Sequence, residues 1–138
     1  MNRWLIAAGV LDGAAALLHL GCIIGGPAWY HFFGAGDAMV AMAERGMMRP
    51  TLITVTIAVI LAIWGVYAFS GAGLLPHLPL LRPALVAIAA VFLARAAALP
   101  LLFRAMPDRS SAFLWTSSAI VLAIGIVHAI GVSTLATD

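Results

Sequence analysis

The stretch TLITVTIAVILAIWGVYAF, residues 51–69, contains no charged residue and is long enough to cross a bilayer as one helix. A helix rises ~1.5 Å per residue, so about 20 apolar residues span a hydrocarbon core of ~30 Å. Comparable runs occupy residues 4–25, 83–103 and 112–132, and the last of these is also free of formal charge. The sequence therefore predicts one transmembrane domain over residues 1–138, an all-α integral membrane bundle of four transmembrane helices.

The composition supports a membrane protein. Of 138 residues, 64% are hydrophobic and 9% are charged, and the mean hydropathy is +1.13. Such a chain lacks the polar surface that a water-soluble domain of this size needs. The seven basic residues are all arginines and give a formal charge of +2, which is too small and too dispersed for nucleic-acid binding. The single cysteine, Cys22, has no intrachain partner for a disulfide.

The longest connection, residues 26–50, is predicted to contain a short interfacial helix over residues 37–46. Asp37 is suited to the N-cap of this helix and Gly46 to the position just after its end. The connection lies on the membrane face opposite the N-terminus. We name the N-terminal face side A and the opposite face side B.

Arginines indicate an orientation because cytoplasmic loops carry more of them than external loops. With four spans, side B carries more arginines than side A, which favours a cytoplasmic side B and both termini outside. The arginines on side A are Arg3 and Arg82, and those on side B are Arg45, Arg49, Arg104 and Arg109.

Three ionisable residues lie at membrane depth: Asp12 and His19 in the first span and Arg95 in the third. Asp12 and His19 are seven positions apart and so share one helix face. By helical rise, Arg95 lies ~18 Å from side A, between Asp12 at ~12 Å and His19 at ~22 Å. We expect an Arg95–Asp12 ion pair with His19 beside it, because ionisable groups at this depth face a bundle interior or a wet cavity.

The other helices add polar groups near the level of His19. Thr54 in the second span and Ser118 in the fourth complete a layer that predicts a polar pocket opening toward side B. The start of the first connection would cover this opening as a lid. Its candidate binding residues are Trp29, Tyr30 and His31.

Two other interpretations of the polar layer stay open. The charges and hydroxyls can simply fasten helix to helix or helix to partner, together with small-residue seams such as Gly9 with Gly13 and the one at Gly125. Alternatively, they line an ion or proton path. Four short spans leave little room for a path inside one protomer, so transport favours a homo-oligomer.

No metal site or cofactor is predicted. His128 lies ~16 Å in depth from His19, so one haem iron cannot join them, and the simpler interpretation is a satisfied or interfacial histidine. Cys22 and the methionines of the first connection have sulfur ligands that suit a soft metal. However, their spacing matches no recognised metal-ligand motif, and methionine is common on apolar helix faces. The motifs H-E-x-x-H, C-x-x-C and G-x-S-x-G and a Gly-rich phosphate loop do not occur.

The segment GGPAWYHFFGAG, residues 25–36, followed by SGAG at 70–73 and LPL at 78–80, resembles a family of small four-span bacterial inner-membrane proteins that is uncharacterised. The likeness covers roughly the first three spans. It implies a multi-pass protein of a bacterial inner membrane and no particular activity.

The sequence thus predicts a membrane protein whose Asp12, His19 and Arg95 line a pocket for a small or amphipathic, lipid-like molecule. Arg95 would hold an anionic group, and His19 would donate or accept a proton. An enzyme acting on a lipid-soluble substrate and a binding or transport module are both compatible with such a pocket. The alternative is a structural or assembly subunit in which the same charges hold helices or partners together.

Overall fold

The computed structural model describes residues 1–135 as helices joined by loops, and no strand occurs among them. The helices are α1 (Arg3–Gly25), α2 (Pro27–Phe32), α3 (Asp37–Glu44), α4 (Met48–Gly71), α5 (Leu81–Ala97), α6 (Leu99–Ala105) and α7 (Ser111–Ser133). α1, α4 and α7 are each long and apolar enough to cross a membrane, and α5 with α6 forms a fourth candidate span as a bent pair. The chain is therefore an all-α, multi-pass membrane bundle of three to four spans. The last three residues of the predicted domain lie outside the described part.

The predicted span over residues 83–103 is broken. α5 and α6 are separated by one residue, and their axes differ by 60°. Pro100 lies in the first turn of α6. A proline lacks the N–H that would bond the carbonyl four residues earlier, and its ring clashes with that carbonyl. The expectation of one uninterrupted helix is wrong for this physical reason.

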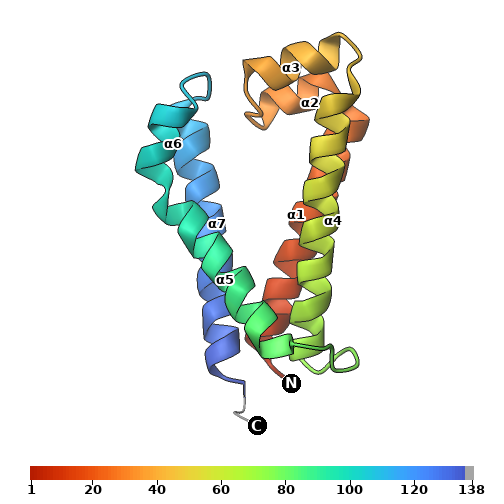
Figure 1. The fold of residues 1–138 in the computed structure, drawn as a ribbon, viewed down its shortest axis with the longest axis vertical. Helices are drawn as coiled ribbons and strands as arrows, with labels where there is room; N and C mark the ends of the chain where they lie inside the picture. Colours follow the sequence, from red (N-terminus) through yellow and green to blue (C-terminus); the bar gives the residue numbers. More distant parts are fainter. Residues whose placement is uncertain (136–138) are drawn as a thin grey trace.

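The helices form two arms arranged as a V (Figure 1). α1 and α4 pack along one another as the first arm, while α5, α6 and α7 make the second. The arms meet on side A, near the N-terminus and the end of α7. There the Asn2 side-chain amide donates to the Gly131 carbonyl at 2.7 Å and to the Thr134 hydroxyl at 3.0 Å. On side B the arms diverge, so the polar residues in the upper half of the spans are not enclosed by a close-packed bundle.

Small residues allow the close helix contacts of the joined end. A Cβ on Gly65 of α4 would lie 3.3 Å from the Gly9 carbonyl oxygen of α1, and one on Gly125 of α7 would lie 3.0 Å from Phe92 of α5. Leu5 and Leu85 are fully buried in the apolar core at this end. Gly9 and Gly125 therefore do lie in helix seams, as the sequence predicted, whereas Gly13 has no neighbour within 4 Å of an added Cβ.

The short helices α2 and α3 lie across the side-B end of the first arm (Figure 1). α3 confirms the helix predicted in the first connection, although its N-cap is Gly36 and Asp37 is its first residue. Gly46 has a φ of 69°, and the N–H of Met47 bonds the Met42 carbonyl at 3.0 Å. This left-handed glycine and the bond reaching back over it end the helix as predicted.

Candidate functional site

A buried histidine–carboxylate pair joins the two arms where they begin to separate. His128 of α7 and Asp12 of α1 are fully buried, and His128 Nε2 lies 2.9 Å from Asp12 Oδ2. When Asp12 is ionised its carboxylate only accepts hydrogen bonds, and Nε2 is then the donor of this bond. The Phe92 ring of α5 stacks on the imidazole with 5.5 Å between ring centroids. Within residues 1–135, Asp12 Oδ1 and His128 Nδ1 have no hydrogen-bond partner.

The predicted Arg95–Asp12 ion pair is absent from the described residues, and His128 takes the place of Arg95. The sequence-based depths placed Asp12 and His128 ~6 Å apart along the membrane normal. However, side chains on a helix lean toward its N-terminus. Because α1 and α7 run in opposite directions, the Asp12 carboxylate leans toward side A and the His128 imidazole toward side B, and the two groups meet.

Arg95 of α5 binds two hydroxyls of α7. Nη1 donates to Ser118 Oγ at 3.1 Å and Nη2 donates to Ser117 Oγ at 3.2 Å. Ser118 was predicted for the polar layer, and Ser117 was not. The Arg95 side chain is partly exposed, and among residues 1–135 no carboxylate lies within ion-pair distance of it. Within residues 1–135 the guanidinium is therefore a charge at membrane depth whose side-chain hydrogen bonds go to neutral hydroxyls.

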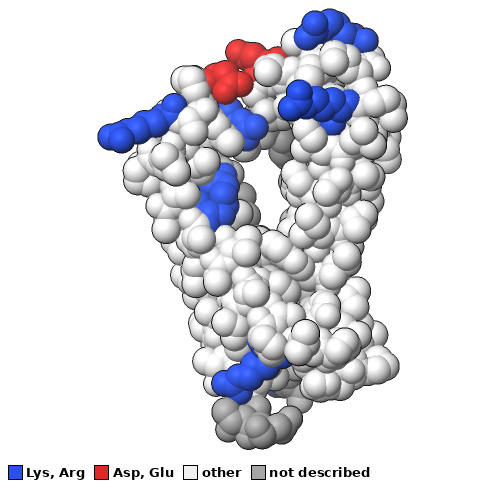
Figure 2. All heavy atoms as spheres, viewed as in Figure 1, with Lys and Arg blue, Asp and Glu red and all other residues white. Residues whose placement is uncertain are grey.

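An opening separates the two arms above their junction. Figure 2 shows that side chains leave this space unfilled, and that basic atoms border it at mid-height on the arm of α5 and α7. Arg95 is the only Lys or Arg between residues 83 and 103, and α7 has none. Arg95 of α5 belongs to this arm, is partly exposed, and holds its guanidinium against Ser117 and Ser118 of α7.

The side-B end of the opening is bridged by the loop between α2 and α3. A Cβ added to Gly34 would lie 2.4 Å from the Phe113 ring of α7, and one added to Gly36 would lie 2.5 Å from Asp108 Oδ2. The backbone of the loop thus lies directly against the second arm, and Figure 2 shows atoms continuing around the top of the opening. The opening consequently faces the lateral surface of the bundle, where lipid would surround it.

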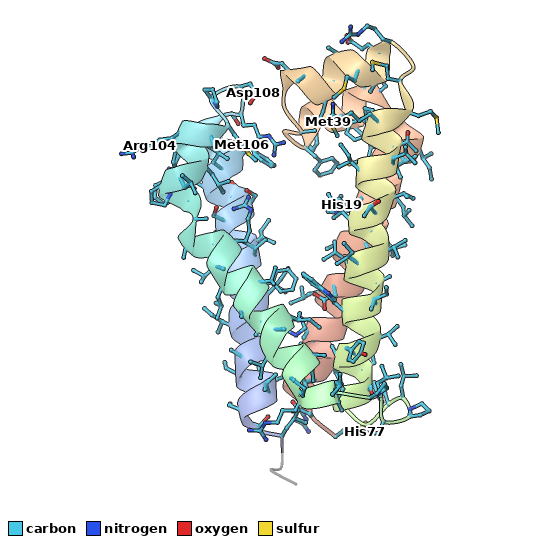
Figure 3. All side chains as sticks on the ribbon, viewed as in Figure 1. His19, Met39, His77, Arg104, Met106 and Asp108 are labelled. Atoms are coloured by element: carbon cyan, nitrogen blue, oxygen red, sulfur yellow. The ribbon has the colours of Figure 1, made fainter. Side chains whose placement is uncertain are left out.

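His19 lies on the first arm, across the opening from α5 (Figure 3). Its Nδ1–H donates to the Ala15 carbonyl of its own helix at 2.7 Å, and the side chain is partly exposed. No hydrogen bond joins it to Asp12 or Arg95 within the described chain. The three ionisable residues of the predicted cluster therefore lie in three places: Asp12 in the buried pair with His128, Arg95 on the second arm and His19 on the first.

The remaining predicted binding residues hold α2 in place. The Tyr30 hydroxyl donates to Thr54 Oγ1 at 3.0 Å, and Thr54 Oγ1 donates to the Pro50 carbonyl at 2.7 Å, so Tyr30 anchors α2 to α4. Trp29 covers α1 where glycines at 21 and 25 leave room for its ring. His31 is exposed on the same short helix. These contacts fix the position of the segment that bridges the opening.

Metal-ligating groups are not clustered in the part of the chain that the structure describes. No three His, Cys, Asp or Glu side chains come together there. Cys22 is a buried free thiol of α1. Comparison with family models, curated proteins and solved structures found no match. What the site does must therefore be inferred from its own geometry.

Proposed function

We propose that the chain binds an anionic amphipathic molecule in the opening between its arms, with the anionic group at Arg95. The observation that carries this proposal is the Arg95 guanidinium, which lies within a span and has two hydroxyl partners but no carboxylate among residues 1–135. A charge at the centre of a bilayer costs about 2.5–3.5 kcal/mol on insertion scales, and such residues commonly mark ligand or ion sites. An anionic ligand offsets that cost more fully than neutral hydroxyls do.

The shape of the opening supports an amphipathic ligand over a small water-soluble anion. The loop at Gly34 and Gly36 lies against the second arm and covers the approach from side B. The lateral face of the opening adjoins the apolar surface of the spans, where large hydrophobic side chains such as Val91 are exposed. A molecule with an acyl or isoprenoid chain reaches Arg95 from within the bilayer and leaves its chain there.

For Asp12 we favour the structural alternative, in which the buried charge holds two helices together. Its carboxylate is fully buried against His128, and the pair joins α1 to α7 at the junction of the arms. In the proposed function this pair sets how far the arms stand apart, while Arg95 contacts the ligand. His19 has Nε2 free of intrachain partners in the described residues and is the candidate proton donor or acceptor on the opposite wall.

The proposed location is a bacterial inner membrane with side B in the cytoplasm. The resemblance of residues 25–36 to a family of bacterial inner-membrane proteins supports this choice of membrane. The greater number of arginines in the connections of side B supports the orientation, because positively charged loops stay in the cytoplasm.

Binding of oleate by the protein purified in dodecyl maltoside, followed by isothermal titration calorimetry, tests the proposed function. Oleyl alcohol has the same chain without the charge and serves as the matched ligand. We expect oleate to bind about tenfold more tightly than the alcohol, since one charge-assisted contact is involved. Arg95→Gln should abolish this preference, Arg95→Lys should keep part of it, and Arg104→Gln should leave it intact.

Arg104 is the matched control because it lies in α6 and points away from the opening (Figure 3). Equal binding of oleate and oleyl alcohol to the unaltered protein would refute the proposed function. So would an unchanged preference for oleate in Arg95→Gln. Circular dichroism of each variant checks that a lost preference does not come from lost helix.

A further inference from the structure

A second arginine lies beside the Arg95 site. Arg109, in the loop before α7, is partly buried, and its Cζ lies 5.6 Å from the centre of the Phe113 ring. Phe113 is four residues before Ser117, so both lie on one face of α7, separated by ~6 Å of helical rise. Since Ser117 accepts from Arg95, one face of α7 connects the two guanidiniums.

Neither arginine forms an ion pair with an acid among residues 1–135. No carboxylate lies within ion-pair distance of either guanidinium among residues 1–135, although Asp108 precedes Arg109 in the same loop. The start of α7 adds to the positive potential, because backbone N–H groups and the helix dipole at an N-terminus attract anions. In the first turn of α7 the Phe113 N–H donates a hydrogen bond to the Ser110 hydroxyl. The N–H groups before Phe113 in this turn have no partner in the described chain.

We propose that Arg95 and Arg109 together form a site for the phosphate monoester headgroup of a lipid. This inference rests on the proposed function and specifies its ligand. A phosphate monoester carries a charge of about −1.5 to −2 at pH 7 and has three acceptor oxygens. A carboxylate or a phosphodiester carries one negative charge, which a single arginine balances.

Two guanidiniums match the dianion in charge. Planar arginine forks bind phosphate oxygens in pairs, and Arg95 retains donors beyond the two that it gives to α7. The Ser118 hydroxyl accepts from Arg95 and keeps its own O–H to donate to a phosphate oxygen. The loop at Gly36 lies against both Asp108 and Arg109, since a Cβ on Gly36 would lie 2.5 Å from Asp108 Oδ2 and 3.3 Å from Arg109 Nε. The headgroup would therefore be held under the bridge while the lipid chains extend through the lateral opening.

Native mass spectrometry of the purified protein with added lipids tests this assignment. The probes are dioleoyl phosphatidate, dioleoyl phosphatidylglycerol and oleate, each titrated at pH 7.5. We expect the unaltered protein to bind phosphatidate about tenfold more tightly than phosphatidylglycerol, the ratio that one additional charge-assisted contact gives. Arg109→Gln should reduce that ratio to about twofold or less while oleate binding persists. Arg109→Lys, which keeps the charge, should retain most of it.

The outcomes separate the two proposals. A phosphatidate preference that is absent, or that survives Arg109→Gln, overturns the phosphate assignment even if oleate still depends on Arg95. Loss of any dependence of oleate on Arg95 overturns the proposed function itself. Inorganic phosphate at millimolar concentration is the third arm: the lipid assignment predicts little displacement of phosphatidate, and full displacement would contradict it. Arg104→Gln is the charge-matched control and should change none of these ratios.

Discussion

The bond between Asp12 and His128 should contribute measurably to stability, because it is a fully buried polar contact between the two arms. Both side chains are fully buried and their bond is 2.9 Å long. Interhelical hydrogen bonds in membrane proteins contribute about 0.6 kcal/mol on average and about 1.7 kcal/mol at most. The complete burial of both side chains places the expected coupling energy near the upper end of this range, at about 1–1.7 kcal/mol.

A double-mutant cycle with Asp12→Ala and His128→Leu measures this coupling. Asp12→Ala alone leaves the imidazole N–H buried without a partner, which costs about 1–3 kcal/mol in addition to the lost packing. In the double variant no polar group is left unpaired, so its free energy of unfolding should fall by less than the sum of the two single changes. The assay is reversible unfolding in mixed dodecyl maltoside and dodecyl sulfate micelles, followed by circular dichroism.

Fluorescence adds a local signal to this cycle. The Trp64 ring of α4 lies 5.2 Å from the Phe92 ring, which itself stacks on His128. We expect Trp64 emission to change in Asp12→Ala and to return toward normal in the double variant. A coupling energy within about 0.3 kcal/mol of zero would refute the conclusion that this bond holds the arms together. Asp37→Ala, an exposed change in α3, is the control and should leave stability within about 0.5 kcal/mol.

Two further predictions concern the packing that positions the site. Tyr30→Phe should cost about 1 kcal/mol and raise amide exchange in α2 alone, because it removes a buried hydroxyl bond to α4. Tyr67→Phe, which loses an exposed bond of 3.4 Å, should leave exchange unchanged. Gly9→Ala should destabilise the protein by about 1–3 kcal/mol in the same unfolding assay, since the new Cβ would lie 2.7 Å from the Phe69 ring. Gly13→Ala, one turn later with no neighbour within 4 Å, should stabilise it by about 0.5–1 kcal/mol. An equal loss of stability in Gly13→Ala and Gly9→Ala would contradict the packing described. So would faster amide exchange in all helices of the Tyr30→Phe variant.

Much of the fold follows from hydropathy, because a run of about 20 apolar residues has few alternatives to a spanning helix. The spans at 4–25, 51–69 and 112–132 correspond to α1, α4 and α7. Pro100 lies at the bend in the predicted span at 83–103. The span was predicted from the length of the apolar run alone. α2 was not predicted, although Gly26 and Pro27 mark a break and a restart of the helix.

The arrangement of the helices was less accessible from the sequence. In a membrane helix the lipid-facing and protein-facing sides are both apolar, so hydrophobic periodicity does not show which faces meet. Depth along the helix predicted Ser118 near the level of His19, and the structure bonds it to Arg95. The same depth argument predicted the wrong partner for Asp12. Depth counted along the backbone does not include the opposite lean of side chains on antiparallel helices. The two-armed form depends on tertiary contacts that no local pattern specifies.

The most direct test of the Arg95 site uses the protein as its own membrane supplies it. Unaltered protein, Arg95→Gln and Arg104→Gln would be extracted gently from the same expression host and weighed by native mass spectrometry without added lipid. The proposed function predicts a retained anionic amphipath on the unaltered protein and on Arg104→Gln, and its loss from Arg95→Gln. Equal retention by all three proteins, or a bare chain in every case, would contradict an anion site at Arg95.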